Sequence, residues 1–244
     1  MNNILITGSN GQLGSELRAL ASVYTNFNFF FTDKISLDIT NYIAVEDFIQ
    51  NYKINIIINC AAYTFVDKAE SEYDLANIVN HLAVKNLALI TKNYSLKLIH
   101  FSTDYVFDGI NKSSYDELSI PNPQSVYGRT KLDGERAIQH LNPSQSIIIR
   151  TSWLYSNFGV NFVKKILDIS SIRSEISVVY DQKGSPTNAS DLADVILQII
   201  PKLKNKNVEL YHYCNEGECS WYDFTKEIFR LKKIKILLKP VKTS

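Results

Sequence analysis

The sequence contains few of the features that mark secreted, membrane or metal-binding proteins. Cysteine occurs three times in 244 residues, as Cys60, Cys214 and Cys219, and this number and spacing fit no disulfide framework and no metal site. A helix needs about 20 consecutive apolar residues to span a bilayer, and no apolar run in the sequence approaches that length. The N-terminus has no basic region, apolar core and cleavage site in series. We therefore expect a cytoplasmic protein without membrane contact, and the sequence predicts no metal site.

An excess of one charge is also missing. The chain carries 26 Lys and Arg residues against 25 Asp and Glu residues, a formal net charge of +1. This balance argues against a nucleic-acid partner or an anionic membrane. The composition, with 45% hydrophobic and 21% charged residues, is that of a packed globular protein. The length fits one large domain or a domain and a half, and no internal repeat is present.

A glycine-rich turn stands near the N-terminus. Residues 4–6 read as a strand and residues 15–21 as a helix, and the turn between them carries Gly8, Gly11 and Gly14. In a dinucleotide-binding turn such glycines allow the tight bend, the approach of a pyrophosphate and close packing of helix on strand. The helix N-terminus offers free N–H groups to the phosphates. A plain glycine turn is the alternative, and the position between two well-marked elements argues against it.

An acidic residue follows the second predicted strand, residues 28–32. Asp33 stands at about the distance from the glycines, roughly 20 positions, where a carboxylate binds the adenosine ribose. Lys34 beside it would instead favour a 2′-phosphate. The two side chains argue in opposite directions, so the sequence does not decide between NAD and NADP.

Asp38 is a further candidate for the adenosine. Its alternative role is to cap the predicted helix over residues 42–52, and Thr40 and Asn41 fit that cap equally well. The sequence leaves these roles open.

Small residues follow the third predicted strand, residues 54–58. Small side chains at the carboxyl end of a buried parallel strand leave room for a ligand at the sheet edge, so residues 59–64 are a second ligand-facing segment. The helix predicted over residues 73–94 carries Asn80 on an apolar side. That amide is either a satisfied buried group or part of the site, and the sequence favours neither reading.

Hydroxyl and carboxyl groups gather after the fourth predicted strand, residues 97–101. Residues 102–109 include Thr103 and Asp104 at the carboxyl end of a central strand, where catalytic groups of such sheets lie. An ordinary turn rich in Ser, Thr and Asp is the alternative.

Tyr127 and Lys131 lie four residues apart in a predicted helix, and therefore on one face of it. A neighbouring ammonium group favours the phenolate and lowers the pKa of a tyrosine, which suits the phenol for proton exchange with a substrate oxygen. Taken alone, the spacing is common by chance, and its weight comes from the rest of the chain.

The repeated βαβ pattern up to the strand at 146–150 predicts an α/β fold with a doubly wound parallel sheet. We assign residues 1–150 to a dinucleotide-binding domain and residues 151–244 mainly to a smaller substrate lobe, with residues 189–214 returning to the first domain. Trp153 would stack on a flat ligand or fill core. The later elements predicted are helices at 158–170, 190–203 and 221–231 and strands at 176–180, 209–214 and 235–239.

Together the glycine turn, the Ser-Thr-Asp at 102–104 and the Tyr-x-x-x-Lys helix resemble the extended short-chain dehydrogenase/reductase superfamily. Finer matches resemble its dTDP-4-dehydrorhamnose reductase family over essentially the whole chain. The matching segments are residues 11–14, 60–64, 66–70, 102–109, 127–135, 150–153 and 181–187. The resemblance implies a Rossmann-type sheet and, with NADPH or NADH, reduction of a dTDP-4-dehydro-6-deoxyhexose at C4, the last step of dTDP-L-rhamnose synthesis for cell-surface polysaccharide.

The resemblance also implies roles for single residues. Tyr127 protonates the forming alkoxide, Lys131 lowers the tyrosine pKa and holds the nicotinamide ribose, and Thr103 binds the carbonyl. The sugar nucleotide contacts Thr103, Asp104 and Trp153. The cofactor is bound by Gly8, Asn10, Gly11, Gln12, Leu13, Gly14, Asp33, Asp38, Ile39, Ala61, Ala62, Tyr63 and Thr64, with Tyr127 and Lys131.

Family members usually continue past a Lys-Thr-Ser such as residues 242–244 with a Pro-rich loop and a final helix that helps close the substrate lobe. We expect this difference to affect substrate affinity and to leave the cofactor half unchanged. Oligomeric state is left open, and a homodimer is compatible with the sequence.

Two rival functions stay open. The regulatory subunit of methionine adenosyltransferase resembles the same reductases and acts through protein contacts; binding of dinucleotide without sugar turnover would favour it. The second rival is a nucleotide-sugar 4-epimerase or 4,6-dehydratase. A dehydratase is expected to place an Asp-Glu pair after the Thr, whereas Asp104 and Tyr105 follow Thr103 here. An epimerase would retain NAD through its whole cycle.

Overall fold

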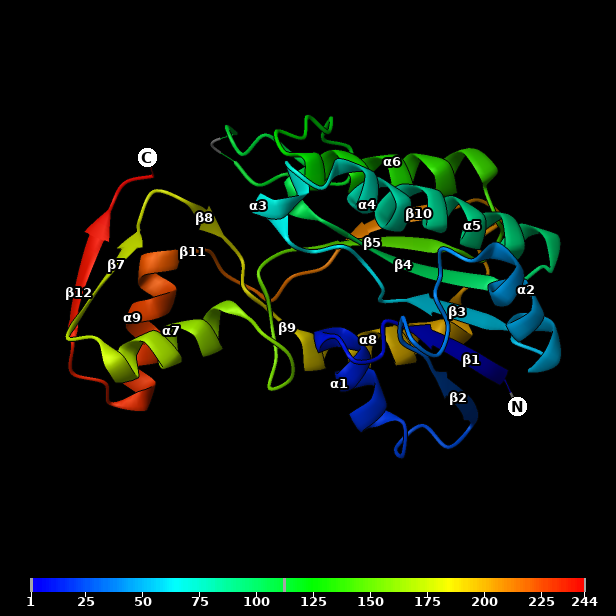
Figure 1. Ribbon diagram of the computed structural model, residues 1–244, viewed down its shortest axis with the longest axis horizontal. Helices are drawn as coiled ribbons and strands as arrows, with labels where there is room; N and C mark the ends of the chain where they lie inside the picture. Colours follow the sequence, from blue (N-terminus) through cyan, green and yellow to red (C-terminus); the bar gives the residue numbers. More distant parts are fainter. Residues whose placement is uncertain (1, 112, 244) are drawn as a thin grey trace.

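The larger lobe of the molecule is built around a parallel sheet of six strands, in the order β10-β5-β4-β3-β1-β2 (Figure 1). The structure is a computed structural model that describes residues 2–111 and 113–243. The strand order reverses between β1 and β3, which is where open α/β sheets bind ligands at their carboxyl edge. The strands are β1 (Asn2–Thr7), β2 (Phe27–Phe31), β3 (Ile56–Asn59), β4 (Lys97–Thr103), β5 (Ile147–Thr151) and β10 (Glu209–His212).

Helices cover both faces of this sheet, and the central strands are accordingly rich in isoleucine and leucine. Ile4, Ile56 and Ile147 belong to the apolar core under α1 (Gln12–Leu20) and α8 (Ala189–Ile199). Leu5, Ile57 and Ile148 belong to the core on the opposite face. The helices there are α2 (Tyr42–Asn51), α5 (Ala83–Asn93) and α6 (Val126–Leu141). The predicted doubly wound α/β fold is confirmed.

The single helix predicted over residues 73–94 is wrong at its centre. The segment instead runs as α4 (Tyr73–Asn77), a π-helical turn (Ile78–Leu82) and α5, after the short α3 (Val66–Ala69). A π turn adds one residue to the helical repeat, which an apolar pattern does not reveal, and such turns often occur at functional sites. The turn lies tightly against α6, because a Cβ atom at Gly134 would stand 2.3 Å from the Asn80 carbonyl oxygen.

The second lobe is built around the parallel pair of β7 (Glu175–Val179) and β12 (Leu237–Val241), with α7 (Phe162–Ile172) and α9 (Trp221–Lys232) packed on it (Figure 1). Two small pairs lie nearer the main sheet: β6 (Leu154–Tyr155) with β9 (Thr187–Asn188), and β8 (Lys183–Gly184) with β11 (Cys219–Ser220). The chain returns to the main sheet in α8 and β10, so the second lobe is made of two separate stretches.

Several predicted boundaries move for local reasons. The helix predicted from residue 158 begins at Phe162, because the Asn161 side chain accepts a hydrogen bond from the Lys164 N–H and caps it. The helix predicted to residue 203 ends in a 3₁₀ turn, Ile200–Lys202, which contains Pro201. A second 3₁₀ turn, Asp104–Val106, follows β4. Over the described residues 2–111 and 113–243, no helix combines the length and the apolar character that crossing a membrane requires.

Candidate active site

The glycine-rich turn needs two of its glycines for steric reasons. Gly8 has a φ of +62°, and a Cβ atom there would stand 2.6 Å from the Ala61 nitrogen. A Cβ atom at Gly14 would stand 2.5 Å from the Ser9 Cα atom. These close approaches bring the turn against the end of β3 and seat α1 on the sheet, the arrangement that the glycine spacing predicts.

The N-terminus of α1 has the properties of a pyrophosphate site. Gly11 stands at the cap position without a side-chain cap, so the first N–H groups of the helix are free to bind an anion. The Gln12 side-chain oxygen Oε1 is buried and has no hydrogen-bond partner among the described residues. The Leu13 side chain is buried in the core, so Leu13 offers only its backbone. These residues fit a dinucleotide.

The adenosine end of the predicted site is organised around Asp33. One carboxylate oxygen accepts from the Asn10 amide at 2.6 Å, and the other accepts from the Ser36 N–H at 2.9 Å. Hydrogen bonds from Ser36 hold the pKa of Asp33 below its ordinary value, so the carboxylate is ionised at neutral pH. The guanidinium of Arg18 lies 4.4 Å from the Phe31 ring centroid and adds a positive charge to α1.

The structure excludes the capping role that the sequence left open for Asp38, and its contact with the adenosine stays a prediction. Asn41 caps α2 by accepting from the Ala44 N–H at 3.1 Å, so Asp38 is not the cap. Asp38 instead accepts from the Thr40 N–H and hydroxyl, and Ile39 between them is buried. This short turn follows Asp33 at the carboxyl end of β2.

Asn80 is a fully satisfied buried amide, and it also connects two parts of the predicted site. Its Oδ1 accepts from the Tyr63 N–H at 2.9 Å, and its Nδ2 donates to the Tyr63 carbonyl at 3.1 Å and the Thr130 hydroxyl at 3.2 Å. Asn80 therefore fixes the segment that contains Ala61, Ala62, Tyr63 and Thr64 relative to α6. Asn80 is therefore a satisfied buried amide, as one of the two sequence hypotheses states, and this does not exclude the other, a place in the site.

Tyr127 and Lys131 stand in the first turns of α6, which Ser125 caps by accepting from the Gly128 N–H at 3.1 Å. Burial raises the pKa of the Tyr127 phenol above its ordinary value, the Thr103 hydroxyl lowers it, and the Asp104 charge raises it. The net shift is upward because burial dominates, and the proposed lowering of this pKa by Lys131 stays a prediction. The phenol is neutral at physiological pH, which is the form that donates a proton.

Lys131 is buried and contacts the backbone of the neighbouring strand. Its Nζ donates to the Phe101 carbonyl oxygen at 2.6 Å. Burial lowers the pKa of Lys131 to about 8, and the charge of Glu135 opposes that shift. The lysine charge is therefore available at neutral pH and sensitive to small changes in its surroundings.

Thr103 and Asp104 lie at the carboxyl end of β4, as the sequence predicts. The Thr103 hydroxyl donates to the Asp104 carboxylate at 3.0 Å and accepts from the Tyr105 N–H at 3.2 Å. Burial raises the pKa of Asp104 to about 6. The structure thus gathers Thr103, Asp104 and Tyr127 around one end of the sheet, with Lys131 one helical turn further in.

Trp153 lies where the chain leaves the main sheet for the second lobe. Its φ of +48° is a left-handed conformation that bulky side chains rarely adopt. Its ring stacks on Trp221 with centroids 3.4 Å apart and an interplanar angle of 7°. One ring face is therefore covered by protein, which supports the core-filling reading, and a flat ligand has only the rest of the partly exposed ring.

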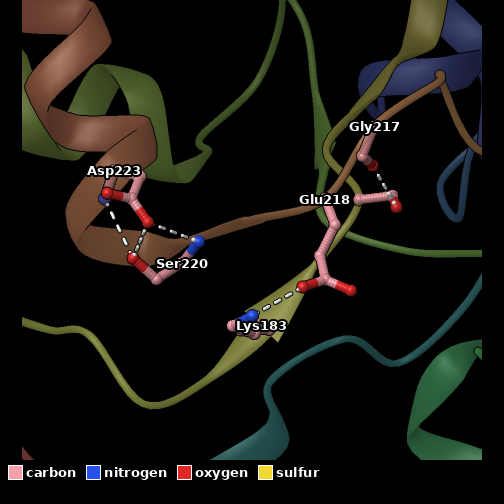
Figure 2. Close-up of polar contacts among 6 residues, drawn as sticks. Lys183, Gly217, Glu218, Ser220 and Asp223 are labelled. Atoms are coloured by element: carbon pink, nitrogen blue, oxygen red, sulfur yellow. Dashed lines mark hydrogen bonds and ion pairs between the residues drawn. The ribbon is translucent and has the colours of Figure 1, made fainter. Parts of the chain in front are cut away.

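The loops beside this tryptophan pair are tied together by polar contacts (Figure 2). Lys183 pairs with Glu218 at 2.8 Å, and the Ser185 hydroxyl donates to the Gly217 carbonyl at 2.7 Å. Ser220 and Asp223 form a capping box at the start of α9. The Lys183 and Ser185 contacts add to the pairing of β8 with β11, and Gly184 of β8 lies close to the Trp153 ring.

A buried ion pair is one feature that the sequence did not assign. Arg150 of β5 binds Glu135 of α6 with two hydrogen bonds, of 2.9 and 2.7 Å, and both side chains are buried. Glu135 lies one turn beyond Lys131. Both residues stand in segments that resemble the family, 127–135 and 150–153, but nothing in the sequence pairs them across α6 and β5.

Comparison with known proteins identifies the family of this chain. A family model described as the RmlD substrate binding domain matches residues 1–244. A curated dTDP-4-dehydrorhamnose reductase from Aggregatibacter actinomycetemcomitans is 42% identical over 232 residues, which are 94% of this chain and 79% of the relative. This chain belongs to the dTDP-4-dehydrorhamnose reductase family. The resemblance found in the sequence is confirmed.

Solved structures of this reductase family have the same fold. A Clostridium acetobutylicum dTDP-4-dehydrorhamnose reductase has a TM-score of 0.93 and 46% identity, covering 99% of this chain and 84% of its own. The Bacillus anthracis enzyme in complex with NADP has a TM-score of 0.94 and 41% identity, covering 100% and 86%. A Streptomyces niveus relative named dTDP-4-keto-6-deoxy-D-glucose reductase is 37% identical over 227 residues, 93% of this chain and 77% of the relative.

Proposed function

We propose that this reductase uses NADPH or NADH to reduce the C4 ketone of dTDP-4-dehydro-L-rhamnose to dTDP-L-rhamnose. Family membership supports the reaction, and the neutral, partly buried Tyr127 phenol beside Thr103 is the observation in the site that best supports it. A relative named for a different dTDP-4-keto sugar has similar identity, so the choice of sugar is itself part of the proposal. We place the reaction in the cytoplasm.

The proposed chemistry assigns one proton to this chain. When bound, the nicotinamide supplies the hydride that reaches C4, and the carbonyl oxygen gains negative charge. Tyr127 donates its phenolic proton to that oxygen, and the phenolate left behind is stabilised by the nearby Lys131 ammonium before solvent reprotonates it. The Thr103 hydroxyl, which donates to Asp104 in the structure, would rotate to donate a hydrogen bond to the same oxygen. A phenol that is already in place is effective because it needs no reorganisation as charge develops.

The cofactor would lie across the carboxyl edge of the sheet. The free N–H groups at the start of α1 would bind the pyrophosphate, and the acceptor Gln12 Oε1 would need a donor such as a ribose hydroxyl of the cofactor. Asp33 and Asn10 face the adenosine ribose. Lys131 would hold the nicotinamide ribose, and Asp104 and Trp153 would contact the sugar nucleotide.

The direct test follows oxidation of the reduced nicotinamide with enzymatically prepared dTDP-4-dehydro-L-rhamnose. We expect turnover with this sugar, and a product that co-elutes with dTDP-L-rhamnose. Cofactor binding without turnover of this or the 6-deoxy-D-glucose-derived 4-keto sugar would contradict the proposal and favour a binding subunit. Turnover of only the second sugar would keep the reaction and change the substrate.

Replacing Asp33 by Asn should shift coenzyme preference toward NADPH. The Asp33 carboxylate is ionised, so it accepts from ribose hydroxyls but repels a 2′-phosphate. We expect the ratio of kcat/KM for NADPH to that for NADH to rise roughly tenfold. Asp47→Asn, on the exposed side of α2, is the charge-matched control. An unchanged ratio in Asp33→Asn would show that this carboxylate does not face the ribose.

A further inference from the structure

A row of buried polar side chains crosses three strands of the main sheet, on the face that α6 covers. Thr7, Asn59 and His100 stand side by side on β1, β3 and β4, because the register pairs Thr7 with Asn59 and Asn59 with His100. The Thr7 hydroxyl donates to Asn59 Oδ1 at 2.7 Å, and Asn59 Nδ2 lies 3.1 Å from His100 Nδ1. All three are at most 1% exposed. None has a role in the cofactor or substrate contacts proposed above.

This row fixes the tautomer of His100. With Asn59 Oδ1 occupied by the Thr7 hydroxyl, the Asn59 amide nitrogen faces the ring, and an amide nitrogen only donates. His100 Nδ1 is then the acceptor, so the ring proton lies on Nε2. Burial and the Lys131 charge hold the pKa of His100 well below its ordinary value, so the ring is neutral.

The other edge of the His100 ring lies on the α6 side of the sheet. Residues two apart on a strand share a face, so His100 and Ser102 lie on the face of Leu98, which packs in one core with Ile138 of α6. Lys131 Nζ reaches the same stretch, where it donates to the carbonyl of Phe101, between His100 and Ser102.

Several hydrogen-bonding groups there lack partners among the described residues. His100 Nε2 and Ser102 Oγ are buried, and neither has one. The Lys131 ammonium carries three N–H groups, and its hydrogen bond within the described ranges is the one to Phe101. Native proteins satisfy such buried groups, often with an internal water that makes about three hydrogen bonds.

We propose that Thr7, Asn59 and His100 are positioning residues for Lys131: the row fixes the His100 ring, and the ring and Ser102 hold an internal water against the lysine ammonium. The water accepts from His100 Nε2 and from Lys131 and donates to Ser102 Oγ. In this role the water solvates a charge that is otherwise enclosed by protein. The inference depends on the proposed function only in taking Lys131 as the group that assists Tyr127.

The direction of the effect follows from the groups that face Lys131. On α6 these are Tyr127 and Glu135, and Arg150 of β5 neutralises Glu135. From β4 and the residue after it they are His100 and Asp104. Loss of the water removes solvation from the ammonium, and so lowers the Lys131 pKa further below its value of about 8. A reaction that needs the charged lysine then fails at lower pH.

The test titrates Lys131 directly by NMR on the full chain with ¹³C at the lysine ε-carbons, the signal being identified by its loss in Lys131→Arg. We expect the Lys131 midpoint to fall by roughly one pH unit in both His100→Leu and Ser102→Ala. His100→Gln keeps a hydrogen-bond donor at this position, so its Lys131 midpoint should lie close to the wild-type value. His140→Leu, on the exposed end of α6, should leave the midpoint unchanged.

A second measurement determines the tautomer of the His100 ring. In the wild type, ¹⁵N chemical shifts should show the proton on Nε2 only. Thr7→Val should give a mixture of tautomers, because the Asn59 amide can then rotate by 180°. An unchanged Lys131 midpoint in both His100→Leu and Ser102→Ala, or a wild-type proton on Nδ1, would overturn the inference. If His100→Leu does not fold, Ser102→Ala and Thr7→Val carry the test. Because no substrate is present, failure here is distinct from failure of the reductase assignment.

Discussion

Tyr127→Phe should lower kcat by about 10²- to 10⁴-fold, the range for loss of a positioned general acid, while the dissociation constant for NADPH changes little. The substitution removes only the phenolic hydroxyl and keeps the ring, which packs edge-on against Tyr105 with centroids 5.5 Å apart. Steady-state oxidation of NADPH and fluorescence titration of cofactor binding measure the two quantities. Activity should fall without loss of cofactor affinity because the proton, and not the binding surface, is removed.

Tyr105→Phe is the matched control, since Tyr105 is 44% exposed and is the ring partner of Tyr127. It should keep kcat within a few-fold of the wild type. If Tyr127→Phe retains wild-type turnover, another group supplies the proton. Asp104, whose pKa burial raises to about 6, would then be the next candidate, and Asp104→Asn would separate the two.

Arg150→Leu should reduce the free energy of unfolding by about 3–5 kcal/mol, because it leaves the buried Glu135 carboxylate without its partner. The two hydrogen bonds between these side chains connect β5 to the middle of α6, directly behind Lys131. Urea unfolding at pH 7, with the slope of the transition compared between variants, measures the loss. Replacing both residues by leucine should recover much of the stability, since a well-packed apolar pair costs less than a single buried charge.

A neighbouring ion pair supplies the control. Arg136 and Asp133 lie on the same helix at 3.5 Å, with side chains 63% and 30% exposed. Arg136→Leu should cost less than about 1 kcal/mol, as exposed pairs do. Equal losses in Arg136→Leu and Arg150→Leu would contradict the view that burial makes the Arg150 pair important.

The sequence predicts well what depends on local periodicity. The isoleucine runs, the glycine turn and the four-residue spacing of Tyr127 and Lys131 each predict a feature that the structure contains. The sequence fails where a long-range contact decides the outcome. The phenol pKa is set by burial under elements far along the chain, so its direction could not be taken from Lys131 alone.

Two other features were beyond sequence reasoning for the same cause. The π-helical turn at Asn80 is stabilised by hydrogen bonds to Tyr63 and Thr130, and an apolar pattern carries no trace of them. The polar row of Thr7, Asn59 and His100 depends on strand register, which fixes neighbours across the sheet and not along the chain.

The late position of β10 in the chain has a consequence for synthesis. β5 is complete at Thr151, but its outer neighbour begins only at Glu209, after α7, β7 and α8. While the ribosome makes the intervening residues, at about 5–20 residues per second, β5 presents an unpaired edge. During that interval the nascent chain is open to strand addition by other chains. The arrival of residues 209–212 ends this exposure, so the first stretch of the second lobe must be translated before the main sheet is complete.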